Sequence, residues 1–310
     1  MVNERFIMDY ISINNKILPA KKALISAQDR GFRFGDGAFE TCLIKDGKIY
    51  NWEAHLKRLE AGLKAIKINI SHLSAPHSSR ALYHPRPRGD EAWDENGKLK
   101  EYSLQLIQKN KIQNGYLRIA VSRGVGSVGY LPIKNIEPTI IIETLPLISK
   151  PKSSIKLCIS KIQKPSLKSL PVNYKLSQGL NSTLVKLEAI DNDCFDGVVL
   201  NDKNQICETS SANIFWIKNN ILYTPHQDCG CLLGTIRGKI LELSPIKTKL
   251  AKAKIDDLLN ADEAFITNIA IGVLAIDKIE NKKFTVKKYS KIFSDLLHQN
   301  IKKYVQDQAN

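Results

Sequence analysis

Apolar and polar residues alternate along the first part of the chain, which predicts half-buried β-strands. The alternation runs through 6–13 and again through 38–44, and each run leads into a turn pair, at 14–15 and 46–47. A period of two joined to such a turn is typical of a β-hairpin. In 52–66 leucine and isoleucine instead recur every three or four residues, which predicts an amphipathic helix with one face on a core.

The pattern changes sharply at about 73–95, where proline, arginine, histidine and tryptophan gather in a chain otherwise rich in lysine and isoleucine. We interpret this segment as an atypical surface insertion. The helical period resumes in 99–107, and apolar runs at 116–121 and 139–143 predict buried strands. These elements together predict an N-terminal α+β domain over 1–150.

The second half of the chain predicts another mixed domain. Residues 151–172 contain two prolines in the stretch 162–172 and are expected to connect the halves. The domain that follows, 173–310, shows both helical and strand patterns. In chain order its expected elements are a helix at 178–190, strands at 197–200, 212–217 and 221–224, a helix at 236–243, a strand at 264–267 and a helix at 289–304.

Composition supports a folded protein of ordinary type. With 310 residues, 43% hydrophobic and 25% charged, the chain can bury two cores and does not fit disordered or fibrous classes. It has no apolar run of membrane-spanning length, and its first residues lack the order of a signal peptide, so we expect a cytoplasmic protein without a membrane partner.

The net charge of +15 raises the question of a polyanionic partner. The lysines are spread through every segment, without an interleaved aromatic platform or a nucleic-acid module, which favours a solvated lysine-rich surface over nucleic-acid binding. The six cysteines form no C-x-x-C pair and are expected to be reduced. The histidines form no ligand cluster, so no metal site is predicted.

One glycine-rich run needs separate treatment. Gly124 to Gly129 matches the G-x-G-x-x-G pattern of dinucleotide-binding proteins and follows a predicted strand. However, Pro132 comes too soon for a phosphate-binding helix, and no acidic residue stands at the distance needed to hold a ribose. We therefore interpret these glycines as a loop whose backbone approaches another part of the protein closely.

Four further motifs are informative as a set. They are the glycine-rich stretch 29–41 (DRGFRFGDGAFET), Asn173-Tyr174-Lys175, the stretch 208–215 (ETSSANIF), and 233–237 (LGTIR). In residue type, order and spacing these motifs closely resemble the class IV aminotransferase family, the fold-type IV pyridoxal-phosphate enzymes. The resemblance covers nearly the whole chain apart from the insertion. It implies an α/β protein of two domains, with D-amino acid aminotransferase-like architecture, that forms a homodimer and holds pyridoxal 5'-phosphate between the domains, with 173–310 as the PLP-binding domain.

The resemblance implies a role for two residues at the reactive end of the cofactor. Lys175 matches the family's catalytic lysine, which bonds the cofactor aldehyde. A lysine in a partly desolvated, electropositive cleft has a lowered pKa, so it can act as nucleophile and then as acid and base. Glu208 matches the carboxylate that faces the ring nitrogen, and the cofactor withdraws electrons well only while that nitrogen is protonated.

At the other end of the cofactor, a phosphate needs backbone N–H groups at a helix N-terminus and a bidentate cation. Thr235 and Ile236 match the first requirement and Arg58 the second. Ser210 and Ser211 are expected to donate hydroxyl hydrogen bonds nearby.

The resemblance also bears on the reaction. The run 122–130 and the segment 261–273 are similar to those of aminodeoxychorismate lyases, and Thr41 stands where branched-chain aminotransferases commonly have glycine. This implies conversion of the small anionic substrate 4-amino-4-deoxychorismate to 4-aminobenzoate and pyruvate, in folate biosynthesis. Arg123, Tyr130 and Asn268 would receive the substrate. An aminotransferase for branched-chain or D-amino acids with 2-oxoglutarate is the alternative, and a non-catalytic polyanion-binding protein is a third.

Overall fold

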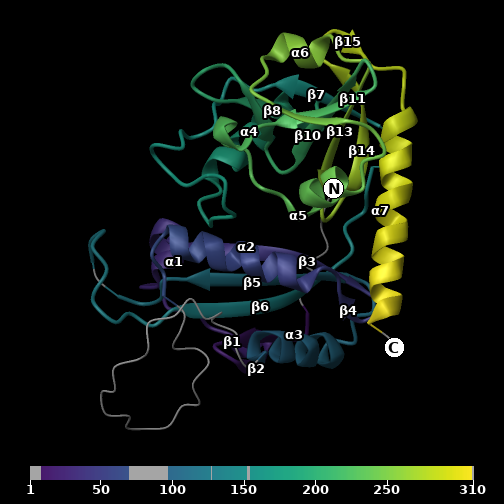
Figure 1. Cartoon of the computed structure of the whole chain (residues 1–310). Coiled ribbons are helices and arrows are strands. Elements are labelled where there is room, and N and C mark those ends of the chain that lie inside the picture. The colour runs from purple at the N-terminus through teal and green to yellow at the C-terminus, as the bar shows by residue number, and fades with distance from the viewer. Residues whose placement is uncertain (1–7, 70–96, 127, 152–153, 309–310) are drawn as a thin grey trace, which may run out of the picture.

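The computed structural model describes residues 8–69, 97–126, 128–151 and 154–308, and every structural statement below concerns these residues. Two sheets divide the described chain into two halves (Figure 1). The first half contains a six-stranded sheet and the second a nine-stranded sheet. Helix α7 (Lys288–Asp307) runs along one side of the molecule, beside both.

The first sheet is antiparallel, in the order β2-β1-β6-β5-β3-β4. Apolar residues from its strands form one core with residues from α2 and α3, and burying each leucine there stabilises the fold by about 2 kcal/mol. The elements of this half are β1 (Tyr10–Ile13), β2 (Lys16–Pro19), η1 (Ala20–Lys22), α1 (Arg30–Phe34), β3 (Gly37–Lys45), β4 (Lys48–Ile49), α2 (Trp52–Ala65), α3 (Lys98–Lys109), β5 (Gly115–Ser122) and β6 (Thr139–Pro146).

The second sheet has the order β12-β11-β10-β13-β14-β7-β8-β9, with β15 paired to β14. It is mixed, because β7 runs parallel to both β8 and β14, and β11 runs parallel to β12. Its elements are β7 (Ile155–Ile159), α4 (Leu180–Asp191), β8 (Asp196–Leu200), β9 (Ile206–Thr209), β10 (Asn213–Lys218), β11 (Ile221–Pro225), η2 (Gln227–Cys229), α5 (Thr235–Glu242), β12 (Thr248–Ala251), α6 (Ile255–Leu259), β13 (Glu263–Asn268), β14 (Gly272–Ile279), β15 (Lys282–Lys283) and α7.

Helix α7 ties the two halves together. Its side chains belong to the core of the second half, where Phe293 and Leu297 are buried together with Tyr50 of the first half. The Tyr50 hydroxyl donates a hydrogen bond to Asn300 Oδ1 at 2.7 Å, and Lys48 Nζ donates to the carbonyl of Val305 at 2.9 Å. These contacts fix the relative position of the two sheets.

The structure confirms the α/β class and the elements expected from the sequence, with ends that differ by a few residues. One expectation needs correction. The stretch 151–172 is more than a connection, because β7 lies inside it and pairs within the second sheet. The prolines that follow β7 obscured this short strand. The expected insertion at about 73–95 lies outside the described residues.

One smaller expectation is also confirmed. Gly124 has φ +97°, and a Cβ there would stand 1.8 Å from the carbonyl oxygen of Glu137, so the glycine-rich loop does approach neighbouring backbone closely. The six cysteines are unpaired and buried. In the part of the chain that the structure describes, no helix combines the length and apolarity needed to cross a membrane.

Candidate active site

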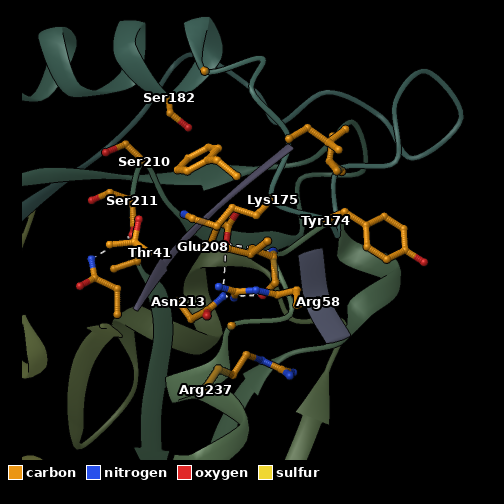
Figure 2. A pocket seen from close by; sticks show the side chains of 18 of the residues that line it. Thr41, Arg58, Tyr174, Lys175, Ser182, Glu208, Ser210, Ser211, Asn213 and Arg237 are labelled. Carbon is orange, nitrogen blue, oxygen red and sulfur yellow. Dashed lines mark hydrogen bonds between the residues drawn. The ribbon is translucent and has the colours of Figure 1, made fainter. Parts of the chain in front are cut away.

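A cavity of about 300 Å³ lies between the two halves of the protein (Figure 2). This is the size of a pocket for a small ligand. Side chains from β3 and α2 line one part of it, and side chains from the second half line the rest. Every residue predicted to bind the cofactor lines this cavity, namely Arg58, Lys175, Glu208, Ser210, Ser211, Thr235 and Ile236.

Lys175 reaches the cavity from the segment between β7 and α4. Its carbonyl accepts a hydrogen bond from the Phe39 N–H at 3.0 Å, which continues the pairing of β3 into the second half. Its ammonium lies 4.4 Å from the centre of the Phe39 ring. Burial and the nearby charge of Arg58 lower the pKa of Lys175 from 10.5 to about 8. A substantial fraction of this amine is therefore neutral near physiological pH, as a nucleophile requires.

Glu208, at the end of β9, points toward the same space as Lys175 and is only 6% exposed (Figure 2). Its Oε2 accepts hydrogen bonds from the Leu232 N–H at 3.0 Å and from Asn213 Nδ2 at 3.2 Å. Its Oε1 accepts one from Lys164 Nζ at 2.6 Å. Burial alone would lower the pKa of Lys164, but the Glu208 carboxylate outweighs it and raises that pKa. The sequence did not predict this cation.

The N-terminus of α5 forms another wall of the cavity. The helix begins at Thr235 without a side-chain cap, so its first N–H groups are open to a ligand. A Cβ on the preceding Gly234 would stand 2.1 Å from Asn213 Oδ1, which explains glycine at that position. Arg58 Nη1 lies 3.3 Å from the carbonyl of Leu233, close to this terminus.

Arg58 is held by Glu40, a residue to which the sequence assigned no role. Arg58 Nε and Nη2 each donate to a different Glu40 oxygen at 2.7 Å, and His55 Nδ1 lies 2.8 Å from Oε2. Burial would raise the pKa of Glu40, but Arg58 and His55 outweigh it and lower the pKa to about 2. The period-two pattern could have revealed this carboxylate, because Glu40 shares the buried side of β3 with Ala38 and Cys42.

A buried aspartate orders the serines at the edge of the cavity. Asp196 is fully buried, and its Oδ2 accepts hydrogen bonds from Thr209 Oγ1 and Ser211 Oγ, both at 3.1 Å. Its Oδ1 accepts one from the Ser210 N–H at 3.2 Å. The Ser211 hydroxyl thus donates its hydrogen bond to Asp196, although Ser211 lines the cavity. Asp196 is a second functional neighbour that the sequence did not single out.

The residues predicted to bind the substrate are not all in the cavity. Arg123 is outside it, because Nε and Nη2 donate to Asp36 at 2.7 and 3.0 Å and the remaining guanidinium edge binds the carbonyls of Ile66 and Lys67. Tyr130 is also outside and is 85% exposed. Neither residue lines the cavity in the described chain, and their substrate roles stay predictions. The motif that suggested them forms a loop held down by its own ion pair.

Asn268 does line the cavity, but its amide has other partners. Nδ2 donates to the carbonyl of Ser211 at 3.0 Å, and Oδ1 accepts from the N–H groups of Ala270 and Ile271. These bonds fix the turn between β13 and β14. One Nδ2 hydrogen is donated to Ser211, so only the second could reach a substrate carboxylate without breaking one of these bonds.

Arg118 is a cation near the site that the sequence did not identify. Its Cζ lies 4.7 Å from the centre of the Phe39 ring, and its charge contributes to the lowered pKa of Lys175. In the β3–β5 register Arg118 stands opposite Thr41, which lines the cavity. Opposite residues of antiparallel strands project from the same face. Arg118 is half-exposed, and its guanidinium is 3.7 Å from the Glu143 carboxylate.

Comparison with known proteins agrees with this geometry. Residues 37–279, most of the chain, match the model of the amino-transferase class IV family. The chain belongs to this family. Class IV aminotransferases and their lyase relatives are pyridoxal-phosphate-dependent enzymes, and the cavity fits that cofactor. It combines a partly buried lysine of lowered pKa, a buried carboxylate, an arginine and an open helix N-terminus.

Relatives of this class IV enzyme carry different names. A putative branched-chain-amino-acid aminotransferase of Methanocaldococcus jannaschii is 28% identical, covering 92% of this chain and 93% of its own. An aminodeoxychorismate lyase of Vibrio harveyi is also 28% identical, covering 82% and 88%. Among solved structures, the branched-chain amino acid aminotransferase of Escherichia coli has a TM-score of 0.82 at 20% identity, covering 95% of this chain and 94% of its own. This structural likeness establishes the fold.

Proposed function

We propose that this protein is an aminodeoxychorismate lyase, which converts 4-amino-4-deoxychorismate to 4-aminobenzoate and pyruvate and so serves folate biosynthesis. The observation that carries the proposal is the place of Thr41. Its side chain lines the cavity at the position where branched-chain aminotransferases commonly have glycine. The threonine reduces the space beside Phe39 and adds a hydroxyl that can bind an oxygen of the substrate.

In this proposal the cofactor is held at both ends by the residues predicted for it. Arg58 and the first N–H groups of α5, at Thr235 and Ile236, bind the phosphate, and Glu208 holds the ring nitrogen. When bound, pyridoxal phosphate withdraws electrons from the carbon that carries the substrate amino group. Lys175 Nζ takes the proton from that carbon, which its lowered pKa of about 8 favours near neutral pH.

The substrate is a small dicarboxylate, and we assign one of its carboxylates to Arg118. This arginine projects on the side of the sheet that Thr41 presents to the cavity, and its pairing with Glu143 is long at 3.7 Å. Arg123 is unsuited to the role in this chain because Asp36 and two carbonyls already hold its guanidinium.

We also propose that the protein works as a homodimer in the cytoplasm. Exposed apolar residues on α4 support the dimer, since Leu180, Leu184, Leu187 and Ile190 follow one side of the helix. An apolar stripe of this kind on a surface helix is typical of a protein–protein contact. Nucleic acid and membranes are not among the partners we propose.

An aminotransferase acting on branched-chain or D-amino acids with 2-oxoglutarate is the second candidate. The relative from M. jannaschii favours it, because that protein bears an aminotransferase name and covers more of this chain than the lyase of V. harveyi does. Arg118 is compatible with this candidate too, since 2-oxoglutarate is also a dicarboxylate.

The deciding experiment supplies both kinds of substrate to the purified protein loaded with pyridoxal phosphate. With aminodeoxychorismate synthase, chorismate and glutamine present, we expect fluorescent 4-aminobenzoate to form only when this protein is added. With leucine or D-alanine and 2-oxoglutarate, we expect little glutamate. Glutamate formation without 4-aminobenzoate would instead establish the aminotransferase.

Variants of Thr41 test the residue that carries the proposal. We expect Thr41→Gly to lower 4-aminobenzoate formation about tenfold, as the loss of one hydrogen bond and of packing would. Thr41→Ser is the matched control, because it keeps the hydroxyl and should keep most of the activity. Equal activity of the glycine and wild-type proteins would remove the support that Thr41 gives.

A further inference from the structure

The Glu40–Arg58 pair has a geometry that a simple charge pair does not need. Glu40 lies on β3 and is 1% exposed, and Arg58 lies on α2 with a side chain that is 12% exposed. The two bonds of 2.7 Å join Arg58 Nε to Oε1 and Nη2 to Oε2. A bidentate pair of this kind fixes the plane of the guanidinium as well as its position.

Arg58 lines the cavity, and its Nη1 donates toward the start of α5. Nη1 lies 3.3 Å from the carbonyl of Leu233, two residues before Thr235. This contact is longer than the bonds to Glu40. The guanidinium is therefore anchored on the side of Glu40 and presents its other edge to the wall where the helix N–H groups open.

His55 supports Glu40 from the far side. The imidazole is 1% exposed, and burial lowers its pKa although Glu40 opposes this shift. The neutral ring donates from Nδ1 to Glu40 Oε2, and Nε2 has no hydrogen-bond partner among the described residues. Glu40 is thus held between a histidine and an arginine and has little freedom to turn.

We propose that Glu40 is a positioning residue that aims Arg58 at the phosphate of the cofactor, and so makes the site select phosphorylated pyridoxal over pyridoxal. Glu40 does not touch the ligand and acts only through the guanidinium. The inference rests on the assignment of Arg58 to the phosphate made above. It does not depend on whether the enzyme is a lyase or an aminotransferase.

The test measures binding of pyridoxal 5'-phosphate and of pyridoxal to the protein freed of cofactor, by the change in visible absorbance and in tryptophan fluorescence. We use Glu40→Asp, because aspartate keeps the charge but withdraws the carboxylate by one methylene and so breaks the bidentate geometry. We expect the dissociation constant for pyridoxal phosphate to rise about tenfold, or about 1.4 kcal/mol. The constant for pyridoxal should stay within about twofold of wild type.

Arg58→Ala and the double variant complete a thermodynamic cycle. Arg58→Ala should lose roughly a hundredfold in affinity for pyridoxal phosphate, and adding Glu40→Asp to it should change nothing further, since Glu40 acts only through Arg58. Glu53→Gln is the matched control, an exposed carboxylate on the same helix α2 that pairs with Lys100. It should leave both dissociation constants unchanged.

The outcomes separate the two assignments. If Arg58→Ala does not reduce the preference for the phosphorylated ligand, the phosphate assignment of Arg58 fails. The other case is that Arg58→Ala does reduce this preference. The inference about Glu40 is then overturned if Glu40→Asp leaves the preference intact or weakens the binding of both ligands equally. It is also overturned if Glu40→Asp lowers the affinity further when it is added to Arg58→Ala. Should Glu40→Asp not fold, Arg58→Lys decides. A lysine cannot keep both bonds to Glu40 and reach the phosphate, so retained preference in that variant would overturn the inference.

Discussion

The cavity and the loop after β5 both bring arginine and carboxylate side chains together, but they use them differently. In the cavity Glu40 binds one edge of Arg58 with two bonds of 2.7 Å, and on the other edge Nη1 makes one longer bond of 3.3 Å to the carbonyl of Leu233. At the start of that loop Arg123 binds Asp36, which precedes β3 and also receives Arg30 of α1, and the outer edge of Arg123 is bound by the carbonyls of Ile66 and Lys67.

The difference shows how an ion pair can serve either recognition or structure. A guanidinium carries five N–H donors in a fixed fork. When a carboxylate takes one side and leaves the other toward a cavity, the arginine is pre-oriented for an anion. When carbonyls take the rest, as at Arg123, the arginine joins β5 to the end of α2 and has little left for a substrate.

The largest expected effect concerns the cavity. Lys175→Ala should reduce turnover by on the order of 10⁴-fold or more, since it removes both the attachment point of the cofactor and the acid–base group. The measurement is 4-aminobenzoate formation together with the visible absorption of the bound cofactor, which should disappear. Lys168→Ala, at an exposed lysine outside the cavity, is the control. Comparable turnover in the two variants would contradict the assignment of Lys175.

The next effect tests the contrast between two arginines. Arg123→Ala should lower the free energy of unfolding by about 2 kcal/mol, because Asp36 and two carbonyls lose charge-assisted hydrogen bonds, while the KM stays near the wild-type value. Arg118→Ala should show the opposite pattern, with a small change in the free energy of unfolding and a raised KM. The exposed pair of Arg118 with Glu143 contributes less than about 1 kcal/mol to the free energy of unfolding. The KM should rise about tenfold if Arg118 binds a substrate carboxylate. Urea unfolding measures the stability of each variant, and steady-state kinetics measures its KM. If KM rises in Arg123→Ala and stability falls in Arg118→Ala, the substrate role returns to Arg123.

The smallest expected effect is a shift in the pH midpoint at which Lys175 reacts with an aldehyde. The pKa of Lys175 is lowered to about 8 by burial and by Arg58, and only the neutral amine attacks an aldehyde. The rate at which the cofactor-free protein reacts with pyridoxal should therefore rise with pH and reach half its maximum near pH 8. Arg58→Ala removes a positive charge that disfavours the ammonium, so the midpoint should move to higher pH. Pyridoxal is used because it has no phosphate for Arg58 to bind, and a midpoint that does not move would refute the coupling.

The residues that bind the cofactor could be predicted from the sequence, but the residues that support them could not. The cofactor residues lie on regular elements or beside them, so the motifs around Lys175, Glu208 and Thr235 marked them correctly as neighbours in one cavity. The residues that support them are far away in sequence. Lys164 and Asp196 meet Glu208 and Ser211 only after the second sheet has formed, and a single lysine or aspartate in a charged chain carries no local signal of such a meeting.

The sequence by itself determined the α/β class, most of the strands and helices, and the family to which the chain belongs, because periodicity and motif spacing are local properties of a chain. The tertiary structure alone decided what each charged side chain does with its hydrogen bonds. Arg58 and Arg123 are the same residue type in family motifs, yet Arg58 lines a cavity and makes one long bond to a carbonyl, whereas Arg123 lies outside the cavity and makes short bonds to two carbonyls. The number of donors left for a ligand depends on which distant backbone and carboxylate groups fold around the arginine, and that is fixed only when the two sheets and their helices pack.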